Sequence, residues 1–287
     1  MSYIFDYLVN LKDLTVIYPK EDTHQYRNFT NACCQRTSLK ELHVQEAGLD
    51  MTITPTDPEE SDIRCYFVDY LIQAVLMVDN IRLESFSHIA SLPLHSSTFT
   101  ALRARATHLH KLVLRTSIQS QLRALFNQPT HWASASTLKT LVIRTCSGVH
   151  LGAVSLHCAN GVFGQLQRLG VIRCGYDDHV LFEAVNQSPR WTIGVLERLD
   201  IDHADHQEMM ALSTIHVQEV YATRIFTIAL TNALNTGGWP GLQKLHTQPQ
   251  GDGPSLQFSD LKRICDAREI SLSTDAVPYG NCNCHNE

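Results

Sequence analysis

One spacing of apolar residues recurs along the chain and limits the folds that it can adopt. In the stretch 166–174, leucines at 166 and 169 are followed by a valine at 171 and a cysteine at 174. Side chains of a strand alternate between its two sides, so Leu169 and Val171 face one way and Arg168 faces the other. A chain that repeats this short strand many times is expected to fold by stacking similar units.

The repeats extend along almost the whole chain. Clear copies of the frame begin at Leu11, Leu39, Leu109, Leu138, Leu166 and Leu196, and weaker copies begin at Val78, Val217, Leu242 and Ala267. Most successive copies are separated by the 20–29 residues typical of leucine-rich repeats, or by slightly more. Apolar residues between the strands, such as Leu71 and Val75, recur at helical spacing.

The pattern predicts an α/β fold in the form of a leucine-rich-repeat solenoid with a horseshoe shape and about ten irregular repeats. Parallel strands are expected on the concave face and helices on the convex face, because helices are wider than strands. We expect this array to occupy residues 1–273, followed by a flexible tail at 274–287. A polar stretch at about 50–62 is expected to be a surface loop inserted between a strand and a helix.

Composition excludes several classes of protein. Hydrophobic residues make up 44% of the 287 residues, which is enough to build a core and argues against a mainly disordered chain. The formal net charge of -6 argues against general nucleic-acid binding. We expect no membrane-spanning segment and no signal peptide. The nine scattered cysteines suit buried thiols, which favours a cytoplasmic or nuclear location.

Motifs for catalysis or cofactor binding are not recognisable, so we expect neither enzymatic activity nor a cofactor. The phosphate-loop pattern and the G-x-S-x-G pattern are both absent. The tail residues Cys282, Cys284 and His285 are spaced poorly for structural zinc. The densest polar cluster runs from Asp200 to His206 and could hold a divalent ion if its side chains converged, although a solvated loop is the preferred interpretation.

Two repeats carry a family resemblance. The segments Leu138-x-x-Leu141-x-Ile143-x-x-Cys146 and 166–174 resemble the cysteine-containing leucine-rich repeats of F-box proteins, within the ribonuclease-inhibitor-like superfamily. F-box proteins are substrate receptors of cullin-type ubiquitin ligases, so the resemblance implies protein partners that include a ubiquitin-ligase adaptor. Only ten residues precede Leu11, and no F-box module is recognisable in the sequence.

The alternation of each strand also predicts which residues lie on the concave face. In the middle of the array these are arginines and a lysine around three apolar residues. The predicted partner-binding residues are Arg82, Lys111, Val113, Arg115, Val142, Arg144, Arg168, Ile172 and Arg198. An exposed apolar centre with arginine around it is typical of protein-binding surfaces, and guanidinium groups suit acidic or phosphorylated partners.

The sequence therefore favours a non-catalytic protein-recognition scaffold, with the substrate receptor of a ubiquitin ligase as its most specific form. Two alternatives remain open. One is a metal-dependent hydrolase that uses the Asp200–His206 cluster, and the other is a structural or sensor module without a fixed partner. If the protein is a recognition scaffold, the strand face is its expected binding site.

Overall fold

The chain forms two compact units, Met1–Leu138 and Lys139–Glu287. The computed structural model describes residues 12–18, 38–46, 69–77, 81–89, 94–116, 132–134, 136–145, 166–173, 196–202, 209–210, 213, 216–223, 225–247 and 256–274. The predicted loop at 50–62 and nearly all of the predicted tail lie outside these residues. Each unit is described by itself below.

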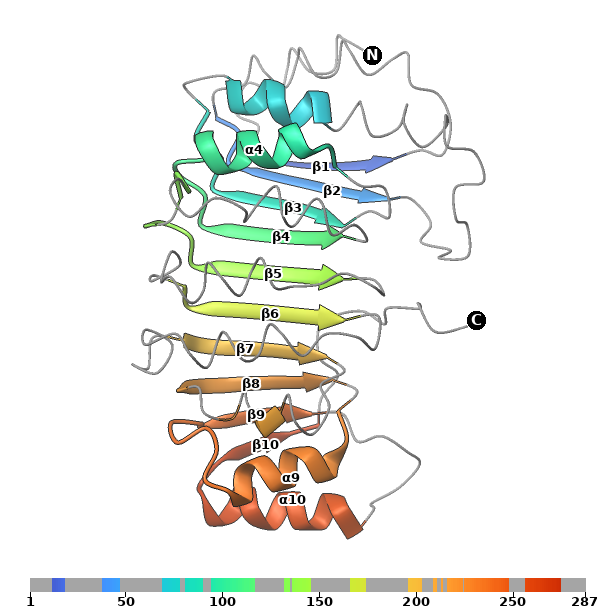
Figure 1. Ribbon diagram of the computed structural model, residues 1–287, viewed down its shortest axis with the longest axis vertical. Helices are drawn as coiled ribbons and strands as arrows, with labels where there is room; N and C mark the ends of the chain where they lie inside the picture. The colour runs from blue at the N-terminus through green and yellow to red at the C-terminus, as the bar shows by residue number, and fades with distance from the viewer. Residues whose placement is uncertain are drawn as a thin grey trace. The chain divides into compact units, whose positions relative to one another are not determined.

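The first unit contains four described parallel strands that lie side by side in chain order (Figure 1). The strands are β1 (Asp13–Tyr18), β2 (Glu41–Glu46), β3 (Ser85–Ile89) and β4 (Lys111–Thr116). Helical residues 69–77 and helix α4 (Ser96–Arg105) connect the strands. Backbone and hydroxyl groups at the start of α4 donate to buried Asp69, which joins the two helical segments.

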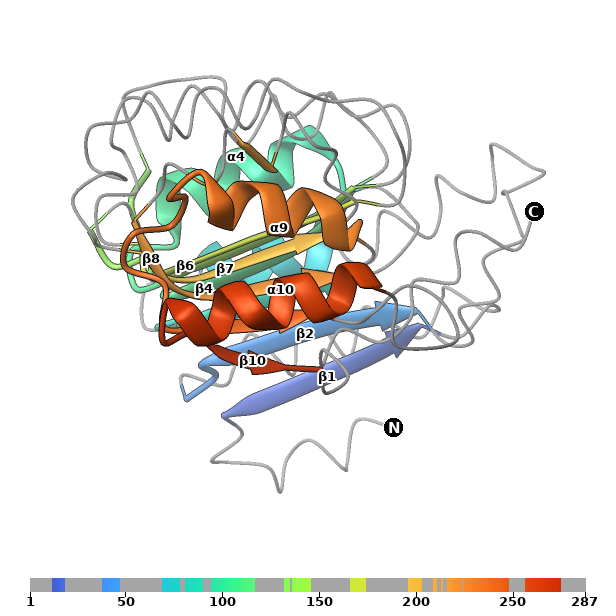
Figure 2. The same cartoon turned by 90° about the horizontal axis from the view of Figure 1, so that it is seen from below.

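The second unit contains six described strands, again parallel and in chain order. They are β5 (Thr140–Thr145), β6 (Arg168–Arg173), β7 (Leu196–Asp202), β8 (Val217–Thr223), β9 (Lys244–Thr247) and β10 (Ser271–Ser273). Helices α9 (Thr227–Asn235) and α10 (Leu256–Ala267) lie together on one side of these strands (Figure 2).

The recurring apolar frame forms the core between strands and helices. Leu141, Leu169, Leu199, Val220 and Leu245 are opposite one another on successive strands and are all buried. Unshifted parallel pairing brings the same frame position of every strand to the same level of the sheet. The predicted α/β repeat fold with a parallel sheet and helices is thus confirmed in its main features.

The predicted register of one weak repeat is wrong. The frame that begins at Val78 would have placed a strand around Ile81, but β3 begins at Ser85. Phe86 is opposite both Leu42 and Leu112, and His88 occupies the next core position with an exposed fraction of 2%. The apolar pattern missed this strand because a polar residue, His88, fills a buried position. Arg82 therefore precedes the strand and is not part of its face.

The last weak repeat is also shifted. The sequence frame aligns Ile270 with Leu245, whereas the structure pairs Leu272 with Leu245. Helix α10 ends just before this strand, where the N–H of Ile270 donates to the carbonyl of Cys265 at 2.8 Å. Glu269 takes a positive φ of 59° in this turn, and Ile270 enters the core. The helix end, rather than the leucine spacing, determines where β10 begins.

No helix within the described ranges is long and apolar enough to cross a membrane.

Candidate functional site

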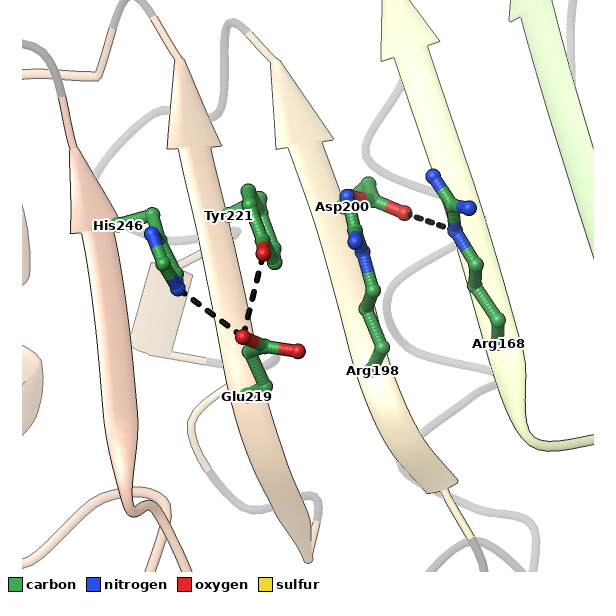
Figure 3. A network of polar contacts seen from close by, with 6 residues as sticks. All are labelled: Arg168, Arg198, Asp200, Glu219, Tyr221 and His246. Carbon is green, nitrogen blue, oxygen red and sulfur yellow. Dashed lines mark hydrogen bonds and ion pairs between the residues drawn. The ribbon is translucent and has the colours of Figure 1, made fainter. Parts of the chain in front are cut away.

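Arg168 and Arg198, two of the predicted arginines of the second unit, lie on the strand side opposite the helices, where a network of polar side chains crosses four strands (Figure 3). We call this set the strand-face network. Its members are Arg168 on β6, Arg198 and Asp200 on β7, Glu219 and Tyr221 on β8, and His246 on β9. The alternation predicted from the sequence therefore places Arg168 and Arg198 on the expected side.

One buried carboxylate holds both arginines. Nε of Arg168 donates to Oδ2 of Asp200 at 2.7 Å, and Nε of Arg198 donates to Oδ1 at 2.9 Å. The Asp200 side chain is 2% exposed, whereas those of Arg168 and Arg198 are 27% and 20% exposed. Two guanidinium groups share a single carboxylate, which fixes their positions.

A stack of flat side chains continues from this ion pair across the next two strands. The guanidinium carbon of Arg198 lies 3.5 Å from the ring centre of Tyr221. The Tyr221 and His246 rings are nearly parallel, at 4° between planes, with their centres 4.0 Å apart. The direct opposition of Tyr221 and His246 on neighbouring parallel strands allows this stacking.

Glu219 contacts both the Tyr221 ring and the His246 ring through one carboxylate oxygen. Its Oε1 accepts a hydrogen bond from the Tyr221 hydroxyl at 3.1 Å and lies 3.0 Å from Nε2 of His246. Burial raises the pKa of Tyr221 above its usual range; Arg198 opposes this shift and Glu219 adds to it. The phenol therefore stays protonated at neutral pH and remains a donor to Glu219.

The predicted exposed apolar centre is wrong, because Val113, Val142 and Ile172 are all buried. A branched side chain on a strand is flanked by the side chains of both neighbouring strands, which lie only about 4.8 Å away. Val142 also lies directly over Gly170 on the next strand, where an added Cβ would come within 2.9 Å of its Cγ1. These residues fill the sheet surface instead of presenting an apolar patch.

The other predicted face residues have different outcomes. Lys111 is exposed on β4 in the first unit. Arg115 and Arg144 lie in β4 and β5, but their side chains are outside the described part of the structure. Arg82 is not on a strand, as described above.

The acidic cluster that begins within β7 is also arranged differently from the prediction. Asp200 and Asp202 were expected to be exposed, but both are buried, and the arginines cover Asp200. His203, Asp205 and His206 lie outside the described residues. No group of three or more histidine, cysteine or acidic side chains among the described residues is arranged to hold a metal ion. The alternative of a metal site at Asp200–His206 therefore remains untested.

The sequence missed the connections within the strand-face network. Asp200 is two positions from Arg198 but 32 from Arg168, so their contact depends on the register of two strands. The same is true of Tyr221 and His246. The sequence did carry one signal: Asp200, Tyr221 and His246 occupy the same position of the apolar frame in successive repeats. This signal predicts contacts only when the strand register is known.

Comparisons with known proteins support the fold and identify no family. No protein-family model matches the chain, and no curated protein matches it. Among solved structures, it resembles a chain from the crystal structure of the Rad7 and Elc1 complex in yeast, with a TM-score of 0.51 at 11% sequence identity. The match covers 95% of this chain and 70% of that chain, which supports the interpretation as a repeat fold.

Proposed function

We propose that the protein is a non-catalytic recognition scaffold that binds a protein partner on the strand face of its second unit. The carrying observation is the strand-face network, in which arginine, tyrosine and histidine side chains are held in fixed orientations yet stay partly exposed. Arginine and tyrosine are enriched among residues that contribute most to protein interfaces. Preorganised side chains also lose less conformational entropy when a partner binds.

The two partly exposed guanidinium groups favour an acidic segment of the partner. Guanidinium groups bind carboxylates and phosphates through parallel hydrogen bonds, and Arg168 and Arg198 keep 27% and 20% of their side chains exposed. The structural neighbour from yeast comes from a complex of two proteins, which is compatible with a scaffold role. In this proposal the scaffold binds its partner through complementary charge and does not catalyse a reaction on it.

The most specific form of this proposal is a substrate receptor of a cullin-type ubiquitin ligase. It rests on the resemblance of the repeats that contain Cys146 and Cys174 to those of F-box proteins. This form requires a ubiquitin-ligase adaptor among the bound proteins. Mass spectrometry of the proteins that co-purify with the tagged chain tests for such an adaptor, and its consistent absence would leave only the general scaffold role.

The binding face is tested by comparing two glutamine variants of the tagged full chain in the same pull-down. Arg168→Gln removes one guanidinium while Asp200 keeps its contact with Arg198, so the fold is expected to remain intact. Arg263→Gln removes a charge from the exposed surface of α10 and is the matched control. We expect Arg168→Gln to reduce partner recovery about tenfold and the control to leave it unchanged. Equal recovery with both variants would refute the proposed face.

A further inference from the structure

A histidine of the strand-face network lies against a carboxylate. Nε2 of His246 is 3.0 Å from Oε1 of Glu219, and the same oxygen accepts a hydrogen bond from the Tyr221 hydroxyl (Figure 3). An ionised carboxylate only accepts hydrogen bonds, so Nε2 carries the hydrogen of the neutral imidazole ring. A further proton therefore binds at Nδ1, which gives the ring a positive charge and keeps its contact with Glu219.

The titratable groups that face His246 come from the strands on both sides of it. Glu219 and Tyr221 face it from β8, and Lys244 lies two residues earlier on the same side of β9. On the other side, β10 carries no titratable side chain, and Glu269 lies in the turn before it. Tyr221 stays neutral, as described above, and the 20% exposure of the His246 side chain gives the ring access to protons from water.

The described charges of this face are balanced while His246 is neutral. Three cations and three carboxylates lie on it, and they are Arg168, Arg198, Lys244, Asp200, Asp202 and Glu219. One proton at His246 therefore makes the described face positive. Arg144, whose side chain lies outside the described structure, is charged in both states and does not alter this change.

The added charge arises close to one of the two arginines. The Tyr221 ring is stacked between His246, at 4.0 Å, and the guanidinium group of Arg198, at 3.5 Å. Protonated His246 and Arg198 are thus separated by a single phenol ring, a distance comparable to the Debye length of about 8 Å at physiological salt. A partner carboxylate bound at Arg198 is attracted by both cations and reduces the repulsion between them.

We propose that protonation of His246 strengthens the binding of an acidic partner segment to the strand face, so that the interface tightens as the pH falls from about 8 to about 6. This inference rests on the proposed function and adds regulation to it. Histidine is the side chain that ordinarily changes charge in this range, whereas the carboxylates of a partner segment ordinarily stay ionised throughout it.

The inference is tested with a rhodamine-labelled hexaglutamate peptide and the purified full chain, by fluorescence anisotropy at both pH values and constant ionic strength. The parent chain is expected to bind about 3- to 10-fold more tightly at the lower pH. His246→Gln retains a flat amide that can donate to Glu219 but cannot be charged, so this ratio should fall to about one. His110→Gln removes an exposed histidine of the first unit and is the matched control, which should keep the parent's ratio.

Proton uptake gives a second measurement that does not depend on comparing variants at two pH values. Because protonation and binding are linked reciprocally, hexaglutamate binding near neutral pH should take up protons in the parent chain and lose this uptake in His246→Gln. Isothermal titration calorimetry in two buffers of different ionisation enthalpy gives the number of protons. Thermal unfolding at both pH values verifies that each variant retains its fold.

The failure of this inference is distinguishable from that of the proposed function. Equal pH ratios for the parent and His246→Gln, or binding by the parent without proton uptake, would overturn the role of His246, while weaker binding by Arg168→Gln would still support the proposed face. Hexaglutamate binding that Arg168→Gln leaves unchanged at both pH values would overturn the face itself. If the parent bound no hexaglutamate at either pH, the inference would be wrong, and the pull-down would still decide the proposed function.

Discussion

The two sides of the second unit's sheet are built from alternate residues of the same strands but depend on different physical effects. On the helix side, Leu199, Val220 and Leu245 are fully enclosed, and each contributes through burial and close packing. On the other side, Arg198 and Tyr221 remain partly exposed and are held by charge and stacking. The helix side therefore determines mainly stability, and the strand face is available for recognition.

The largest effect is expected at Trp239, the largest fully buried side chain of the described residues. Trp239 is completely buried, its N–H donates to the Ser213 carbonyl, and its own carbonyl accepts from Arg268. Trp239→Ala should lower the free energy of unfolding by about 3–5 kcal/mol, measured by urea denaturation of the full chain. Pro240→Ala, at the exposed neighbouring position, is the control. If Trp239→Ala and Pro240→Ala lowered the free energy of unfolding by similar amounts, burial of the core would not be the main source of stability.

An intermediate effect is expected from the charged residue at the centre of the strand face. Asp200→Ala leaves two guanidinium groups without their shared carboxylate. Because Arg168 and Arg198 retain access to water, the loss should be about 2 kcal/mol, less than for a fully buried ion pair. Urea denaturation gives the value, and Arg168→Gln should cost less because one pair persists. A loss as large as that of Trp239→Ala would contradict the distinction between the sides.

A glycine on the strand face tests whether any position there behaves like the core. An alanine at Gly170 would place its Cβ 2.9 Å from Cγ1 and 3.0 Å from Cγ2 of Val142. The branched valine has little freedom to move aside, so Gly170→Ala should cost about 1–2 kcal/mol in urea denaturation. Combining it with Val142→Ala should recover part of this loss. Additive losses would show that the contact is not the cause.

The smallest effect is expected at the end of α10. Glu269 has a φ of 59°, a conformation that glycine adopts without strain. Glu269→Gly should therefore raise the free energy of unfolding by about 0.5–1 kcal/mol, detectable as a shift of the denaturation midpoint. Glu269→Ala retains the Cβ and should show no such gain. Equal stability of the two variants would remove backbone strain as an explanation.

The sequence predicts the helix side of the sheet better than the strand face. Core positions such as Leu141 and Leu169 can be recognised from their fixed spacing in the sequence, because burial requires only that one side of each strand be apolar. The frame failed at β3, where His88 occupies a core position. It also failed at β10, where the end of α10 shifts the strand relative to the apolar pattern.

Contacts on the strand face could not be predicted from the sequence because they depend on register. Arg168 and Arg198 were correctly placed on that side, but their shared partner was recognised only from the pairing of β6 with β7. The expected apolar patch failed for a related reason. Val142 is buried even though its neighbour across the sheet, Gly170, has no side chain, so its exposure does not follow from the alternation of its own strand.

The parallel pairing of neighbouring strands within each unit limits how such a chain can change its length. One residue inserted inside β8 would exchange the two sides of that strand, moving Tyr221 into the apolar layer and Val220 into the open. An insertion in a connection between strands leaves this order intact. Changes of length are therefore tolerable in the connections between strands. Such changes preserve the row of side chains that the strands present.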